Sequence, residues 1–180
     1  MFRFKLIGSL LGLLMLPLLV ACNDGSKNPK TSDQSAGVAE TLTVYKSPTC
    51  DCCKKWIDHL EAEGFAARIE HPSNLNAIKD RYRIANNLRS CHTAVSTQGH
   101  VFEGHIPARY IHQFLANPPA DAIGLTVPAM PVGSPGMEVG DKFMPYQVQL
   151  MKKDGSTEVF ASVESLARQY QPLKQPDTQP

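Results

Sequence analysis

The chain has 180 residues, of which 42% are hydrophobic, and 18 basic side chains against 17 acidic ones give a formal net charge of +1. This length suits one ordinary domain with tails. The balanced charge offers no electrostatic basis for binding nucleic acid, so we expect no nucleic-acid partner.

The first 21 residues have the pattern of a secretory signal. A basic start is followed at residues 6–20 by an almost wholly apolar run. Residues 19–22 (Leu-Val-Ala-Cys) resemble the lipobox of bacterial lipoproteins, in which the cysteine carries the lipid. About 15 apolar residues are fewer than the roughly 20 that span a bilayer. We therefore predict a signal peptide over residues 1–21, lipidation of Cys22, and a periplasmic protein held by its lipid on the inner or outer membrane.

Composition divides the rest of the chain into a tether, a domain and a tail. Residues 22–40 are expected to be the lipidated cysteine and a flexible tether, because polar residues, Gly and Pro replace apolar ones there. Beyond residue 167 the sequence turns to Gln and Pro, which indicates a flexible tail over residues 168–180. The folded domain is thus predicted at residues 41–167.

The domain begins with a predicted strand, helix and strand. Residues 42–46 are short and rich in β-formers. Residues 52–63 carry apolar side chains at helical spacing and end before Gly64. Residues 65–70 alternate between apolar and polar, and with the helix as a crossover they would pair in parallel with the first strand.

A second helix is expected after a cap at Ser73 or Asn74 and is predicted to close near residues 86–87. Residues 91–96 and 101–103 are then predicted to be two strands joined by a tight turn.

A third helix, a long loop and a hairpin complete the predicted elements. Pro107 suits the first turn of that helix, whose end is expected at residues 118–119 (Pro-Pro). Residues 128–144 are dominated by Pro, Gly, Val and Met and are expected to form a long loop, which is usually functional or disordered. Residues 147–151 and 157–160 are predicted to form the final hairpin.

This order of elements resembles that of thioredoxin-like proteins, in which a thiol motif follows the first strand. Residues 91–115 resemble the second half of a glutaredoxin, and Cys91 and His92 take the place of the proline held beside its thiols. The resemblance implies that Cys91 lies close to the other cysteines of the domain. We therefore predict an α/β fold, a thioredoxin-like (glutaredoxin-like) sandwich with a long Pro/Gly/Met loop and a C-terminal hairpin.

Three cysteines, Cys50, Cys52 and Cys53, stand at the predicted start of the first helix. Unpaired backbone N–H groups and a partial positive charge favour thiolates there. With Cys91, four thiols in an oxidising compartment suggest two disulfides by default, in three possible pairings. Three thiols this crowded cannot all serve as simple staples, so the cluster is a candidate for chemistry.

Two kinds of chemistry fit this cluster. Cys50 and Cys53 have the C-x-x-C spacing of thiol-disulfide oxidoreductases, with Cys50 as the nucleophile and Cys53 as the resolving thiol. Cys52 disturbs such an exchange, because an additional thiolate invites trapped disulfides. Four converging sulfurs suit a soft metal such as Cu(I), and we favour this interpretation. A metal-independent oxidoreductase and a disulfide-stapled binding module remain alternatives.

Other residues extend the predicted metal site. Met130 and Met137 lie in the long loop, where no periodicity assigns them to a core, and thioethers suit Cu(I). His105 lies where a glutaredoxin brings backbone close to its ligand, and imidazole binds copper in either oxidation state. His92 adjoins Cys91 and is a further possible metal or outer-shell residue whose role stays open, but a strand neighbour would point away if Cys91 points at the cluster. The predicted metal ligands are Cys50, Cys52, Cys53, Cys91, His105, Met130 and Met137.

Four segments carry a resemblance to a known family: residues 45–50, 52–56, 103–108 and 124–138. Together they resemble the CopG family of copper-resistance proteins, over residues 41–163. The resemblance implies a thioredoxin-like periplasmic domain that binds several copper ions through cysteine-rich ligation and cycles them between Cu(I) and Cu(II). Whether such turnover makes the protein a copper oxidoreductase is left open.

The family's C-x-C-C motif falls on Cys50, Cys52 and Cys53, and its further cysteine falls on Cys91. This chain has Asp51 where the family commonly has glycine, and a carboxylate there would raise the pKa of nearby thiols by like-charge repulsion. The implied partners are copper ions, other periplasmic copper-handling proteins or an electron-transfer partner, and the membrane through the lipid alone. The implied function is sequestration, transfer or redox conversion of copper.

Overall fold

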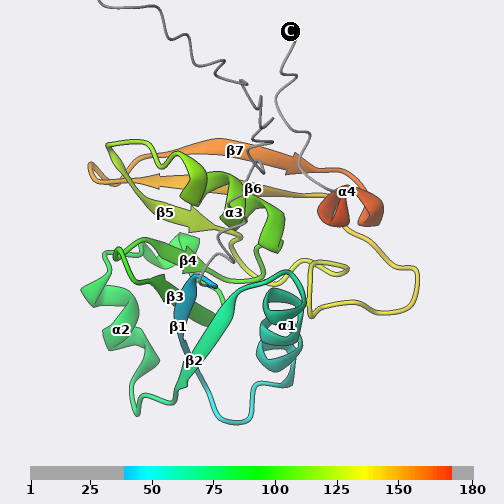
Figure 1. Cartoon of the computed structure of the whole chain (residues 1–180), viewed down its shortest axis with the longest axis horizontal. Coiled ribbons are helices and arrows are strands. Elements are labelled where there is room, and N and C mark those ends of the chain that lie inside the picture. The colour runs from blue at the N-terminus through cyan, green and yellow to red at the C-terminus, as the bar shows by residue number, and fades with distance from the viewer. Residues whose placement is uncertain (1–38, 172–180) are drawn as a thin grey trace, which may run out of the picture. The chain divides into compact units, whose positions relative to one another are not determined.

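A seven-stranded sheet forms the centre of residues 39–171, the part of the chain that this computed structural model describes (Figure 1). The strands lie in the order β2-β1-β3-β4-β5-β6-β7. Their bounds are β1 Thr41–Lys46, β2 Ala66–Glu70, β3 His92–Ser96, β4 Val101–Glu103, β5 Ala122–Thr126, β6 Tyr146–Lys152 and β7 Thr157–Val163. The helices are α1 Asp51–Ala62, α2 Leu75–Arg81, the 3-10 turn η1 Asn86–Leu88, α3 Ala108–Ala116 and α4 Leu166–Tyr170.

The predicted signal peptide, the lipidation site Cys22 and the tether up to residue 38 lie outside the described residues, as do residues 172–180. Between residues 39 and 171, no helix is both long enough and apolar enough to cross a membrane.

The predicted α/β fold is confirmed by how the strands pair. β1 and β2 are parallel, with Thr41 opposite Ala66, and α1 is the crossover between them. On its other side β1 pairs antiparallel with β3, with Lys46 opposite His92. β4 returns antiparallel to β3, and β6 and β7 form the predicted C-terminal hairpin.

Two clusters of apolar side chains cover opposite faces of the sheet. The larger cluster packs α1 and α3 onto one face and fully buries Trp56 and Ile111. The smaller cluster includes apolar side chains of residues 82–88, which follow α2. Val101 and Phe102 belong to different clusters, because successive strand residues point to opposite faces. The larger core therefore supports the helix that carries the cysteines.

The second helix is shorter than predicted. Asn74 caps α2 as one of the two expected residues, and its Oδ1 accepts the Ala77 N–H at 3.1 Å. The helix ends at Arg81, so the prediction that it closes near residues 86–87 is wrong. Arg83 has a positive φ of 57°, and this left-handed backbone cannot continue an α-helix.

Two elements have no counterpart in the sequence-based prediction. β5 joins β4 to β6 in the middle of the sheet, yet Gly124 interrupts its β-forming residues. A Cβ at Gly124 would lie 1.7 Å from the Val101 carbonyl oxygen, so the close strand approach requires glycine. α4 crosses the predicted boundary between domain and tail at residue 167, and its Gln169 is buried.

A buried ion pair ties α2 to the centre of the sheet. Lys79 Nζ lies 2.5 Å from Glu103 Oε1, with side-chain exposures of 3% and 0%. The hydroxyl of Thr93 and the backbone N–H of Ser90 also donate to this carboxylate, each at 2.6 Å. Burial raises the pKa of Glu103, and the Lys79 ammonium opposes that rise. Glu103 therefore holds the Ser90 backbone and the Thr93 side chain, which lie on either side of Cys91.

Replacing Glu103 with alanine should destabilise the domain by about 3–5 kcal/mol, because the Lys79 ammonium would stay buried without its partner. Urea unfolding followed by circular dichroism measures this change. The double variant Lys79→Met, Glu103→Leu should lose less, since neither charge remains. Lys54→Ala, which removes an exposed pair with Asp58, should leave the midpoint nearly unchanged. A Glu103→Ala midpoint equal to that of the parent would contradict the role of the pair.

Candidate metal centre

Cys50 caps the first helix. Its side chain accepts the Cys53 N–H at 3.3 Å, which satisfies one of the free donors at the start of α1. The sulfurs of Cys50 and Cys53 are joined in a disulfide, which is the pairing that the C-x-x-C spacing predicts for exchange chemistry. Cys52 and Cys91 are the free cysteines among residues 39–171.

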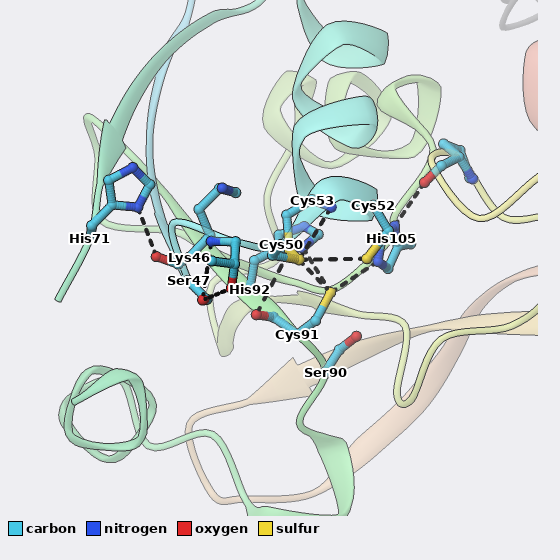
Figure 2. Close-up of a disulfide and its surroundings, with 12 residues drawn as sticks. Lys46, Ser47, Cys50, Cys52, Cys53, His71, Ser90, Cys91, His92 and His105 are labelled. Carbon is cyan, nitrogen blue, oxygen red and sulfur yellow. Dashed lines mark hydrogen bonds between the residues drawn. A yellow bond between two sulfur atoms is a disulfide. The ribbon is translucent and has the colours of Figure 1, made fainter. Parts of the chain in front are cut away.

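Four sulfurs converge at this helix start (Figure 2). The sulfurs of Cys50, Cys52, Cys53 and Cys91 all lie within 4.8 Å of one another. Cys50 Sγ is 3.5 Å from Cys52 Sγ, and Cys53 Sγ is 3.5 Å from Cys91 Sγ. Cys91 immediately precedes β3, so the antiparallel pairing of β3 with β1 carries it to the end of β1 where α1 begins. The structure therefore brings together all four cysteines predicted for the site.

His105 adds an imidazole to this group of sulfurs. Its Nε2 is 3.0 Å from Cys91 Sγ, and its Nδ1 is 2.8 Å from the carbonyl oxygen of Pro135 (Figure 2). A carbonyl can only accept, so Nδ1 carries the proton and the lone pair of Nε2 faces the sulfur. Gly104 makes this position possible, since a Cβ there would lie 2.5 Å from the Val127 carbonyl oxygen.

His92 also faces the site, so the prediction that it points away is wrong. Its Nδ1 is 3.3 Å from Cys91 Sγ, and its ring centroid lies 4.2 Å from that of Trp56 and 5.0 Å from that of His105. The alternation rule does not apply here, because Cys91 precedes the first residue of β3. Within the described part of the chain, the buried Nε2 of His92 has no hydrogen-bond partner.

Burial sets the protonation of these groups. It raises the pKa of the Cys91 thiol to about 12, and the neighbouring Cys52 adds to the rise. Burial lowers the pKa of His105 and, more strongly, that of His92. Both imidazoles are therefore neutral and have a lone pair available for a metal, whereas Cys91 must lose a proton to become a ligand.

The loop over residues 128–144 passes across the start of α1. A Cβ at Gly136 would lie 2.5 Å from the Cys52 carbonyl oxygen and 2.8 Å from the backbone nitrogen of Trp56, so the loop and the helix are in close contact here. Met130 and Met137 both lie in this loop, with Met130 47% exposed and Met137 partly buried. Their roles as ligands stay predictions.

α4 ties this loop to the sheet, a connection that the sequence analysis missed. The buried amide of Gln169 donates from Nε2 to the Gly133 carbonyl oxygen at 2.8 Å and accepts the Tyr146 hydroxyl at 2.7 Å. The Tyr170 hydroxyl donates to Glu138 at 2.9 Å. No local motif announces these bonds, because each joins segments far apart in the sequence.

The Gly136→Ala change should lift the loop from α1. Gly136 has a φ of +84°, so alanine there would cost about 1–3 kcal/mol of backbone strain. The added Cβ would also clash with backbone atoms of α1. We expect faster alkylation of Cys52 by iodoacetamide, measured by mass spectrometry. Gly140→Ala is the matched control, because Gly140 also has a positive φ, of +54°, but no atom within 4 Å of the added Cβ. Equal alkylation rates in the two variants would contradict this contact.

The protein is thus an α/β domain with a cysteine-rich candidate metal centre. Its first helix begins at three cysteines, and a fourth cysteine and two buried imidazoles lie beside them.

Residues 88–137 match the family model described as "Protein of unknown function, DUF411". Two solved structures named copper resistance protein copG are also similar. Form 2 is 40% identical with a TM-score of 0.66, and the match covers 69% of this chain and 98% of that one. Form 1 is 41% identical with a TM-score of 0.64, covering 68% of this chain and 96% of that one.

At this identity and coverage, the chain belongs to the CopG family of copper resistance proteins. The comparison with curated proteins gives no match.

Proposed function

We propose that this chain is a lipid-anchored periplasmic protein of copper resistance, whose thioredoxin-like domain holds more than one copper ion. The observation that supports the proposal best is the convergence of four cysteine sulfurs within 4.8 Å of one another. Thiolates are the ligands that Cu(I) favours, and one sulfur can bridge two ions. Family membership supports copper as the metal, since both structural relatives are named for copper resistance.

The oxidation state of Cys50 and Cys53 controls how many ligands this site offers. When Cys50 and Cys53 form a disulfide, their sulfurs are poor metal ligands. Cys52 and Cys91 are then the two free thiols among the described cysteines. Reduction with two electrons and two protons restores four thiols. The copper-loaded cluster therefore forms on the reduced chain, with His105 beside it and Met130 and Met137 as further ligands from the loop.

Such a site serves sequestration of copper, its transfer to another periplasmic copper protein, or its conversion between Cu(I) and Cu(II) with an electron-transfer partner. The lipid at Cys22 and the tether that follows would keep the domain at the membrane surface while leaving the site accessible to these partners.

Titration with Cu(I) tests this function. The mature chain carrying Cys22→Ser, reduced and kept free of oxygen, should bind at least one equivalent of Cu(I), measured by competition with a chromogenic Cu(I) chelator. Cys52→Ser should weaken binding by more than the roughly 10–100-fold that loss of an outer-shell partner costs, because it removes a ligand. Urea unfolding of the metal-free variant checks that its stability is unchanged.

Two outcomes would contradict copper binding at the cluster: less than one equivalent of Cu(I) per chain, or a Cys52→Ser variant that binds Cu(I) like the parent.

A second candidate function is metal-independent thiol-disulfide exchange, which the Cys50–Cys53 disulfide favours. The Cys53 side chain is fully buried whereas that of Cys50 is partly exposed, so an incoming thiolate would attack Cys50. The helix N-terminus stabilises the Cys50 thiolate after reduction.

If this second function operates, the chelator-treated mature chain should accelerate the reduction of insulin by dithiothreitol, followed as turbidity. Cys50→Ser should abolish the acceleration because it removes the nucleophile, whereas Cys52→Ser should preserve it. A rate equal to that of dithiothreitol alone would exclude this candidate.

A further inference from the structure

His59 connects α1 to two other parts of the molecule, away from the cysteines. It lies in the last turn of α1, and its Nε2 accepts the backbone N–H of Ala108, the first residue of α3, at 3.0 Å. We propose that this contact is a pH-sensitive switch, which holds the start of α3 and the loop over residues 133–138 at neutral pH and releases both in acid.

The contact requires a neutral imidazole. A backbone N–H can only donate, so Nε2 of His59 offers its lone pair and Nδ1 carries the ring proton. A second proton would occupy Nε2 and set two N–H groups against each other. It would also place a positive charge at the start of α3, where the helix dipole disfavours one. Protonation therefore breaks this hydrogen bond.

The start of α3 depends on this acceptor. Pro107 precedes the helix and makes no side-chain capping bond. The His59 ring, reaching across from α1, therefore satisfies a donor that a capping side chain would normally satisfy. When the bond breaks, the N–H of Ala108 has to turn to water, and the first turn of α3 is expected to open more often.

His59 also supports the loop that crosses the start of α1. Its ring meets the ring of Tyr170 in α4 edge to face, with centroids 5.6 Å apart. The Tyr170 hydroxyl donates to Glu138 Oε1 at 2.9 Å, and the same oxygen accepts the Gly136 backbone N–H at 3.0 Å. Gly136 is the loop residue in close contact with α1. A His59 ring that turns away thus removes one support of the loop.

Ionisable groups of both signs surround the ring. They are Lys55 and Glu63, one turn before and one turn after His59 along the chain, Arg109 on α3, Glu138 in the loop and Tyr170 on α4. Burial lowers the pKa of His59, and the carboxylates of Glu63 and Glu138 oppose this change. The folded pKa lies below the unfolded value of about 6.5, so the stability that neutral His59 contributes is lost as the pH falls below that value.

A second histidine between the same two helices behaves differently. His112 of α3 donates from Nε2 to the Glu63 carbonyl oxygen at 2.9 Å, and its ring stacks on Phe65. A protonated imidazole keeps this N–H, so acid leaves the bond in place. Acid therefore opens the start of α3 without separating α3 from the end of α1.

Release of the loop would uncover the start of α1. The use of this opening, which is easier entry of copper to the cysteines, rests on the proposed function. The switch itself does not, because His59, Ala108, Tyr170 and Glu138 are not among the predicted metal ligands.

Hydrogen exchange tests the switch on the metal-free mature chain carrying Cys22→Ser. Mass spectrometry follows peptides covering residues 108–112 and 133–138 at pH 7 and pH 5. His59→Gln is the reference, because its amide oxygen can accept the Ala108 N–H at either pH, and comparison at equal pH cancels the intrinsic pH dependence of exchange. The two chains should exchange alike at pH 7. At pH 5 the parent should exchange roughly tenfold faster in both segments.

Two further variants separate the bond from other effects of acid. His59→Phe keeps a ring but has no acceptor, so it should exchange fast in both segments at both pH values. His112→Gln is the matched control, and it should show the same rise in acid as the parent because His59 is intact. If His59→Phe fails to fold by circular dichroism, the parent and His59→Gln decide the outcome.

Equal exchange of the parent and His59→Gln at pH 5 would overturn the switch. A rise confined to residues 108–112 would also overturn it, because the loop would then be held independently of His59. Both measurements are made without copper, so their outcome is separate from the Cu(I) titration that tests the proposed function.

Discussion

The pairing of β1 with β3 is the interaction on which the whole site depends. β1 ends a short turn before Cys50 and the start of α1, and the register that places Lys46 opposite His92 sets Cys91 against that helix start. A slip of one residue would turn His92 to the other face of the sheet. Both strands lie inside the sheet and their buried side chains pack in the larger core, so core packing favours this register.

Hydrogen bonds to charged and uncharged groups hold the residues around Cys91 and His105. The buried Glu103 carboxylate holds the backbone of Ser90 and the side chain of Thr93, on either side of Cys91. The Pro135 carbonyl orients His105 from the opposite direction. If a metal binds here, the donor side chains would lose little conformational entropy, because folding has already ordered them.

Much of the fold and most of the donor set could be predicted from the sequence. The helix start at Cys50 and the parallel β1–α1–β2 unit follow from local patterns. The position of Cys91 beside the other cysteines follows from the resemblance of residues 91–115 to the second half of a glutaredoxin. The expected orientation of His92 was wrong because β3 begins at His92, so Cys91 lies before the strand and the alternation of side chains does not reach it. β5 contains a glycine required by a neighbouring strand, and α4 is fixed by Gln169 contacts across distant segments, so neither had a local signal.

The attachment of the long loop through Gln169 has a consequence for the order of events in the cell. Synthesis proceeds from the N-terminus, so the cysteines leave the ribosome well before Gln169 does. Until that residue arrives, the hydrogen bond to the Gly133 carbonyl cannot form, and the loop has one anchor fewer over α1. The thiols of a newly made chain thus pass through a period of greater exposure, in which they are more open to oxidation.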